Sequence, residues 1–423
     1  MNYSTIKNEY DIKELIDLYL SGYKFYLYGA GGGASSYDKI SIAALAKINI
    51  KPIAFLDDDF RKQGIFKNEI KIINPDALVA CIDPIVIIIS SNYFESIIKK
   101  ITSLKINNIY IFTVTSLLRN VDPFAFNEIM EYAEVQRRIH MHNAKFIRIK
   151  NQNLDSNSLN LNIVDIQVTE RCTMKCLDCS NLMQYYEKPI NADAEILEFS
   201  IINLLDAVDE ISEIRILGGE PFLYKNLNII IDLFSNNKKV DKVIIYTNAT
   251  FIPNYDTLNS MINGKILVEI TDYVGQSKKK EEFILIMQKL GINYICHEPQ
   301  NWTDSARIIN NDKSEKELNS MFEKCCVNDV LTLLHGKIYH CPFSANVHNL
   351  RAIPTDIIDF VDVYNQNNTI TLKNRLKKFY FGLNYLNACK VCLGRDFTQD
   401  EVIPALQTKK AIPIPIISFK QTV

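Results

Sequence analysis

Glu170-Arg-Cys-Thr-Met-Lys-Cys-Leu-Asp-Cys-Ser180 is the stretch that decides the fold of this 423-residue chain. It follows the apolar, strand-like run 163–169, and its cysteines, Cys172, Cys176 and Cys179, form a C-x3-C-x2-C pattern. Three thiolates can ligate three irons of a four-iron cluster, which leaves the fourth iron with an open coordination position. An open position lets a cofactor bind the metal directly, so the pattern predicts a reactive iron–sulfur cluster.

Two other uses of clustered cysteines fit the chain less well. A structural zinc site usually combines two C-x2-C pairs, or one pair with histidines, and no residue shortly before Cys172 supplies a fourth ligand. A disulfide framework is typical of small secreted chains, whereas this N-terminus lacks the apolar core of a signal peptide. We therefore expect a cluster-binding loop.

The middle of the chain predicts a β/α barrel around this loop. Strand-like runs alternate with helical stretches, at 163–169, 213–217, 242–246, 265–271 and 292–296. Polar or glycine residues follow each run, and the carboxyl ends of parallel barrel strands all open onto one face. Five such segments predict a partial barrel with its site on that face. The residues placed there include Gly218-Gly219-Glu220-Pro221, Asn248 and Asp272.

The cysteine loop and Gly218-Gly219-Glu220-Pro221 together resemble the radical S-adenosylmethionine (SAM) superfamily, over roughly residues 160–400. The resemblance implies that the open iron binds the amino and carboxylate groups of SAM, and that reductive cleavage yields a 5′-deoxyadenosyl radical. It also implies that the tetrapeptide contacts the methionyl part of SAM, with Glu220 pairing with the ammonium group. Asn248 and Asp272 would lie near the ribose and methionyl groups, although turn and capping roles explain both residues equally well.

One position departs from the family pattern. The residue before the third cysteine is commonly aromatic and helps to hold the adenine, but here it is Asp178. The adenine contact then falls to the backbone or to Leu182, Met183 or Tyr185.

A second set of cysteines lies nearer the C-terminus. Cys326-x9-Gly336-x4-Cys341 predicts a hairpin of 330–334 and 337–340 with a cysteine at each base, and Cys389-Lys-Val-Cys392 adds a chelating pair. The pattern resembles the twitch subdomain, the shortened form of the SPASM domain, and implies one auxiliary 4Fe-4S cluster with four cysteine ligands. A four-cysteine zinc site has similar spacing, and Cys325 is an alternative to Cys326.

The N-terminal region predicts a separate Rossmann-like parallel sheet. Its strand-like runs are 24–28, 53–56, 85–89 and 109–113, and Gly29, Gly31 and Ala34 fit a G-x-G-x-x-A turn after the first of them. Asp57 or Asp58, at the end of the second run, could accept from a ribose hydroxyl. The segment resembles small domains attached to sugar-modifying enzymes. A nucleotide, nucleotide-sugar or phosphate ligand and a plain scaffold are equally good interpretations.

Composition limits the classes of partner. The chain has 47 basic and 49 acidic residues, so a generic nucleic-acid or anionic-membrane binder is not expected. The longest apolar runs are too short to span a bilayer. The ten cysteines suit a reducing compartment, where they serve as metal ligands, so we expect a cytoplasmic protein.

These observations predict an α/β protein with a partial (β/α)6 barrel. The expected parts are a Rossmann-like domain (1–122), a helical linker (123–160), the barrel (161–320), a small α+β auxiliary-cluster domain (321–400) and a tail (401–423). The predicted reaction is hydrogen-atom abstraction from a sugar, nucleotide-sugar or polyol, followed by oxidation. The auxiliary cluster would accept the electron, and a flavodoxin or ferredoxin would supply electrons from outside. Peptide maturation and a non-catalytic iron–sulfur sensor or scaffold are the alternatives.

No catalytic acid or base follows from the sequence. Arg307, His340, Tyr273 and Trp302 are polar or aromatic candidates without a motif.

Overall fold

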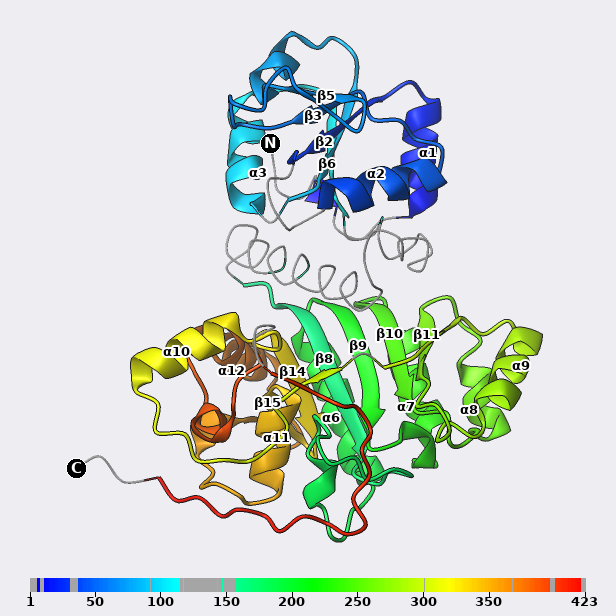
Figure 1. The fold of residues 1–423 in the computed structure, drawn as a ribbon, viewed down its shortest axis with the longest axis vertical. Coiled ribbons are helices and arrows are strands. Elements are labelled where there is room, and N and C mark those ends of the chain that lie inside the picture. The colour runs from blue at the N-terminus through cyan, green and yellow to red at the C-terminus, as the bar shows by residue number, and fades with distance from the viewer. Residues whose placement is uncertain are drawn as a thin grey trace. The chain divides into compact units, whose positions relative to one another are not determined.

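The computed structural model divides the chain into two compact units, Met1–Ser158 and Leu159–Val423 (Figure 1). It describes residues 6–7, 11–30, 37–91, 93–114, 117, 143, 147, 157–299, 301–366, 368–395 and 400–419. The predicted helical linker 123–160 lies largely outside the described residues, so that assignment stays a prediction.

The first unit contains the expected parallel sheet. Its central strands, β2 (Lys24–Tyr28), β3 (Ala54–Leu56), β6 (Ile85–Ile89) and β7 (Ile109–Thr113), coincide closely with the predicted runs. The strand order is β1-β7-β6-β2-β3-β5-β4, and only β4 pairs antiparallel. The outer strands are β1 (Ile6–Lys7), β5 (Ile70–Ile73) and β4 (Phe66–Lys67).

Helices cover both faces of this sheet, as its continuous apolar strands require. The helices α1 (Ile12–Leu20) and α2 (Tyr37–Lys47) pack in one apolar cluster with residues such as Phe25 and Leu27. The helix α3 (Phe94–Ser103) packs in the other, with Tyr26 and Ile87.

The second unit is built on one eight-stranded sheet, ordered β12-β11-β10-β9-β8-β14-β15-β16. Its first five strands along the chain are parallel and follow the predicted alternation with helices. These strands are β8 (Asn160–Thr169), β9 (Glu210–Gly218), β10 (Val240–Thr247), β11 (Ile266–Thr271) and β12 (Tyr294–His297). The intervening helices are α6 (Ala194–Ala207), α7 (Leu227–Ser235), α8 (Tyr255–Ser260) and α9 (Lys280–Leu290).

The sequence predicts six successive β/α units, but the sixth parallel strand does not directly follow the fifth along the chain. After β12 the chain forms the two-residue strand β13 (Trp302–Thr303), which pairs with β17 (Glu401–Val402) instead of joining the barrel. The sixth parallel strand is β14 (Val330–Leu334), and it pairs with β8 at the opposite side of the barrel strands. Because β14 is also the first strand of the predicted hairpin, the auxiliary region and the barrel share one sheet.

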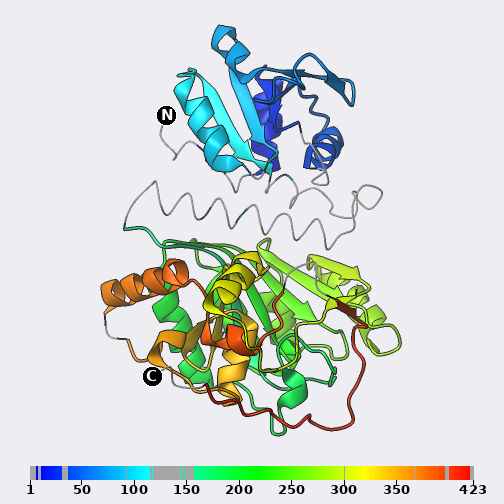
Figure 2. The same cartoon turned by 60° about the vertical axis from the view of Figure 1, so that its left-hand side comes forward.

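The auxiliary region completes this sheet and adds helices (Figure 2). The hairpin turns at His335 and Gly336, which both have positive φ angles (46° and 81°), and returns as β15 (Lys337–His340). The remaining elements are α10 (Glu315–Lys324), α11 (Pro342–Asn349), β16 (Val361–Asp362) and α12 (Thr369–Gly382). Figures 1 and 2 show the three helices together beside the β14 end of the sheet, away from α8 and α9.

Side chains along the barrel strands alternate between the face that packs against the helices and the face that lines the inside of the barrel. Val164, Ile166 and Val168 of β8 belong to the apolar cluster that includes Leu197 and Ile201 of α6. The residues between them, Asp165 and Gln167, therefore point to the opposite face of the sheet. The same alternation on neighbouring strands lines the interior with polar side chains.

Candidate functional site

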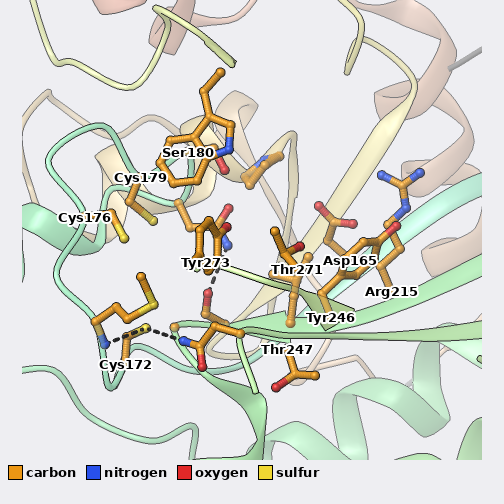
Figure 3. A pocket seen from close by; sticks show the side chains of 18 of the residues that line it. Asp165, Cys172, Cys176, Cys179, Ser180, Arg215, Tyr246, Thr247, Thr271 and Tyr273 are labelled. Atoms are coloured by element: carbon orange, nitrogen blue, oxygen red, sulfur yellow. Dashed lines mark hydrogen bonds between the residues drawn. The ribbon is translucent and has the colours of Figure 1, made fainter. Parts of the chain in front are cut away.

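A cavity of about 330 Å³ opens at the carboxyl ends of the barrel strands (Figure 3). It collects residues from the cysteine loop, from the ends of several barrel strands and from the C-terminal region. Its lining comprises Asp165, Cys172, Met174, Cys176, Cys179, Ser180, Asn181, Arg215, Leu217, Gly218, Gly219, Tyr246, Thr247, Asn248, Thr271, Tyr273, Trp302, Val327, Pro342 and Arg395.

The structure brings the three loop cysteines together on this cavity. Backbone N–H of Met174 donates to Cys172 Sγ at 3.4 Å, and Asn248 Nδ2 donates to the same sulfur at 3.7 Å. Gln407 Nε2 donates to Cys176 Sγ at 3.2 Å. Sulfurs that accept N–H donors while facing one cavity are the donor set that a three-thiolate cluster needs, so these residues fit a site-differentiated 4Fe-4S cluster.

The protein alone does not ionise these thiols. Burial raises the pKa of Cys176 to about 11, and burial also raises the pKa values of Cys172 and Cys179. A bound metal cluster supplies the positive charge that deprotonates a coordinating thiol. The loop is therefore shaped for metal ligation and unsuited to a free thiolate nucleophile.

Two glycines let the end of β9 run against the cysteine loop. Gly219 N–H donates to Thr169 O at 2.9 Å, and Glu220 N–H donates to Arg171 O at 2.8 Å. A Cβ atom on Gly219 would lie 2.2 Å from Arg171 O, and one on Gly218 would lie 2.4 Å from Thr169 O. The backbone approach leaves no room for a side chain, which accounts for both glycines. Pro221 then begins a short helical turn, Pro221–Leu223.

Glu220 lies behind the cavity wall and is not part of the lining. Its carboxylate is fully buried and accepts from Thr247 Oγ1 at 2.9 Å, Asn248 N at 3.0 Å and Phe222 N at 3.3 Å. Burial raises its pKa to about 7 against the effect of these donors. In this structure Glu220 positions Thr247 and Asn248, and its pairing with an ammonium group stays a prediction.

The two other barrel candidates take different positions. Asn248 lines the cavity and bridges to the cysteine loop through its donation to Thr173 Oγ1 at 3.2 Å. Asp272 does not line the cavity, because it forms an ion pair with Lys280 at 2.5 Å. Its near neighbours Thr271 and Tyr273 line the cavity instead.

The aromatic surface of the cavity comes from Tyr273 and Trp302. Their rings meet edge to face with centroids 6.0 Å apart. The adenine candidates Leu182, Met183 and Tyr185 are buried and absent from the lining, and Asp178 is ion-paired with Arg307 at 2.9 Å. His340 is also buried, with its Nε2 bonded to Phe379 O. Of the candidates without a motif, Tyr273 and Trp302 thus belong to the site.

The C-terminal segment 400–419 covers the cysteine loop, which the sequence did not predict. Leu177 N–H donates to Leu406 O at 2.6 Å, Thr408 N–H donates to Lys175 O at 2.7 Å, and Lys175 N–H donates to Gln407 Oε1 at 2.7 Å. The segment runs as an extended chain, red in Figures 1 and 2. It therefore belongs to the site.

The second cysteine set surrounds a smaller cavity, with one change from the predicted ligands. Cys325, Cys341, Cys389 and Cys392 line it, whereas Cys326 does not. Burial raises the pKa of both Cys325 and Cys326. After burial, the groups that most affect the pKa of Cys325 are other cysteines. For Cys326 they are the charged residues Arg395, Asp329 and Arg215.

The geometry of the second set thus favours Cys325 over Cys326 as the fourth thiol. In the part of the chain that the structure describes, no three His, Cys, Asp or Glu side chains converge closely enough to hold a single metal ion. The auxiliary cluster stays a prediction.

The N-terminal candidates are only partly described. Gly29 has a φ of 111°, and a Cβ there would lie 2.8 Å from the Ser91 side chain. Asp57 Oδ2 accepts from Ala30 N and Lys62 Nζ, both at 3.0 Å, so this carboxylate ties the turn to the second strand. Gly31 and Ala34 lie outside the described residues. Ligand binding here stays a prediction.

Several charged or polar lining residues escaped the sequence analysis. Asp165, Arg215 and Tyr246 lie within strands, and Arg395 lies beyond the last cysteine pair. Arg395 lines both cavities, where its Nε donates to Ser305 Oγ at 2.9 Å. Side chains alternate between the two faces of a strand, and this alternation around Arg215 and Tyr246 could have indicated that both side chains point into the barrel.

The family model and the curated relatives that match this protein each cover only part of the chain. Residues 166–282 match a family model described as a 4Fe-4S single cluster domain. A GTP 3′,8-cyclase from Desulforamulus reducens is 31% identical over 98 residues, covering 23% of this chain and 30% of that protein. One from Campylobacter jejuni is 33% identical over 105 residues, covering 24% and 32%. The chain thus spans about a third of the length of these curated relatives.

The solved structures that match this chain share less sequence with it. BtrN in complex with AdoMet and 2-DOIA is 16% identical, covers 58% of this chain and 98% of that one, and has a TM-score of 0.36. Streptococcus suis SuiB bound to S-adenosylmethionine is 14% identical, covers 73% and 84%, and has a TM-score of 0.34. Among the described helices, none has the length and apolar character needed to cross a membrane.

Proposed function

We propose that this chain is a radical oxidoreductase of the radical SAM superfamily, and that it acts on a sugar, nucleotide-sugar or polyol. When bound, the cluster and SAM would supply a 5′-deoxyadenosyl radical that removes a hydrogen atom from a C–H bond of the substrate. An external one-electron donor such as flavodoxin or ferredoxin would provide the reducing electron.

A single observation carries this proposal: the three thiols, the glycine backbone and Asn248 face one cavity of about 330 Å³. That volume lies within the range of roughly 300–1,000 Å³ for small-molecule sites. Cys172, Cys176 and Cys179 would hold the cluster, while Gly218 and Gly219 present backbone without side chains beside it. Trp302 and Tyr273 offer the flat surface on which an adenine ring can stack.

The oxidative part of the proposal rests on the second cysteine set. Cys325, Cys341, Cys389 and Cys392 would hold a cluster in which every iron is ligated, and such a cluster exchanges electrons without binding substrate. Arg395 lines both cavities and places a positive charge between the two sets of thiolates. The substrate radical could then pass its electron to this second site.

The sequence relatives favour a second candidate, because each is a GTP 3′,8-cyclase by name. On that reading the substrate would be a guanine nucleotide and the reaction a radical cyclisation. Product analysis with GTP distinguishes the two candidates.

Anoxic reconstitution with iron, sulfide, reductant and SAM tests the proposal. The wild-type protein should release 5′-deoxyadenosine and methionine, and a variant with Ala at Cys172, Cys176 and Cys179 should not. Equal turnover by the triple variant would refute the assignment. A wild-type protein that assembles the cluster but never cleaves SAM would favour a sensor or scaffold.

A further inference from the structure

Arg395 is a charged residue that the two cysteine cavities have in common. It lines the cavity of the cysteine loop and also the smaller cavity of the second cysteine set. Among the residues that the structure describes, only Val327 is shared between the two cavities in the same way, and its side chain is apolar. A positive charge at Arg395 is therefore placed to act on both sets of thiols.

The backbone of Arg395 is held by the second cysteine set. Cys326 N–H donates to Arg395 O at 3.0 Å, and the preceding residue, Gly394, donates its N–H to Cys392 Sγ at 3.3 Å. Gly394 has a φ of 95°, a conformation that favours glycine. These contacts fix the start of the Arg395 side chain next to the second set of cysteines.

The side chain of Arg395 reaches the cysteine loop. Its Nε donates to Ser305 Oγ at 2.9 Å, and its Nη2 donates to Ser180 O at 3.4 Å. Ser180 directly follows Cys179, so the guanidinium lies at the loop that carries the first set of thiols. Both acceptors are uncharged, so these hydrogen bonds orient the guanidinium without cancelling its positive charge.

The charge of Arg395 influences thiols of both sets. Burial raises the pKa of Cys179, Cys341 and Cys392, and Arg395 opposes the effect of burial at each of the three. Cys179 belongs to the cysteine loop, and the other two belong to the second set. A cation near an iron–sulfur cluster stabilises the reduced, more negative state, so it raises the reduction potential of that cluster.

We propose that Arg395 is a shared electrostatic residue, whose single positive charge raises the reduction potentials of the loop cluster and of the auxiliary cluster together. Each cluster is thereby easier to reduce by one electron from an external donor such as flavodoxin or ferredoxin. The inference rests on the proposed function, because it requires both clusters, and it adds the residue that ties their redox properties to each other.

An EPR-monitored redox titration of the anoxically reconstituted holoenzyme tests this role. Arg395→Gln removes the charge and should lower both potentials. A unit charge roughly 10 Å from a cluster, at an effective dielectric constant of about 20, changes a one-electron equilibrium constant by roughly tenfold, which is about 59 mV. Arg395→Lys keeps the charge, so both of its potentials should stay closer to the wild-type values than those of Arg395→Gln.

Controls assign the signals and separate charge from folding. The protein without the loop cysteines keeps only the second cluster, so it identifies the signal of that cluster. Arg351→Gln removes an exposed arginine of the same unit that lines neither cavity, and it should titrate like the wild type. Iron content and thermal unfolding report whether each variant is folded and loaded, and Arg395→Met replaces Arg395→Gln if the latter does not load both clusters.

Several results would overturn the proposal. These are unchanged potentials in a loaded Gln or Met variant, a shift in one cluster alone, equal shifts in the Gln and Lys variants, or no iron in the protein without the loop cysteines. If the Lys variant loads both clusters and the two uncharged variants do not, the requirement for charge is supported. Failure of all three variants to load would instead show a purely structural role. Release of 5′-deoxyadenosine is measured on the same wild-type samples, so a failure of the proposed function is seen separately.

Discussion

Replacing Gly219 by alanine should displace the cysteine loop and impair its function, although no cysteine is changed. A Cβ atom at this position would lie 2.2 Å from Arg171 O, 2.5 Å from Arg171 C and 2.8 Å from Cys172 Cβ. The nearest obstacles are backbone atoms, which cannot rotate away as a flexible side chain can. Arg171 O also accepts from Glu220 N–H at 2.8 Å, so moving it breaks a hydrogen bond that joins the two segments.

The size of the effect follows from this clash. The Cβ must retreat from 2.2 Å to at least 3.0 Å, so Cys172 and its neighbours shift by most of an ångström relative to β9. Overpacking of this kind costs about 1–3 kcal/mol. For a unit of this size that corresponds to a fall of roughly 2–12 °C in Tm. A misplacement near 1 Å at a reacting centre also costs about 100-fold in rate.

Gly264→Ala is the matched control, because a Cβ there meets no atom within 4 Å. Thermal unfolding of the cofactor-free proteins, followed by iron content and 5′-deoxyadenosine release after reconstitution, compares the two variants. Gly264→Ala should behave like the wild type, while Gly219→Ala unfolds earlier and releases far less product. If the two alanine variants are indistinguishable in both assays, the close approach of β9 to the loop is wrong.

Three further predictions concern single side chains. In the protein without the loop cysteines, Cys325→Ala should abolish the remaining iron, about four per chain, whereas Cys326→Ala should retain it; the reverse result would restore Cys326 as the ligand. Gln407→Leu removes the donor to Cys176 Sγ and should lower the reduction potential of the loop cluster in an EPR titration; an unchanged potential would exclude this role. Because the folded pKa of Glu220 is raised to about 7, its ionisation destabilises the cofactor-free fold as pH rises from about 4.5 to 7. Glu220→Gln should therefore gain stability over the wild type across that window, by roughly 3 kcal/mol at most, and a pH-independent difference in urea unfolding would contradict this.

The local part of the structure was predictable from sequence. Each central strand of the first sheet is a short apolar run bounded by turn residues, and its ends agree with β2, β6 and β7. The cysteine loop and the two glycines also follow from sequence, because their chemistry depends on residues close together in the chain. In each case a short-range pattern dictated the local conformation.

Contacts between distant segments were not predictable in the same way. Gln407 reaches Cys176 across more than two hundred residues, and no periodicity signals a donor to a sulfur. The pairing of β14 with β8 likewise joins two strands that lie far apart in the sequence. The choice between Cys325 and Cys326 is similar, since one residue decides which cavity a thiol faces.

Asp165, which lines the cavity of the cysteine loop, illustrates why the candidate site could not be predicted without the fold. Asp165 sits in a run of apolar residues, where a single carboxylate suggests a strand defect more readily than a site. Only the barrel shows that it shares a register with Arg215, and that both line the cavity of the cysteine loop. Val327 and Arg395 line both cavities, so the two sets of cysteines have these neighbours in common. Under the proposed function, a substrate in the first cavity would meet the radical source there, and Val327 and Arg395 would link that cavity to the electron acceptor. That order is the arrangement that a two-electron oxidation by one-electron steps requires.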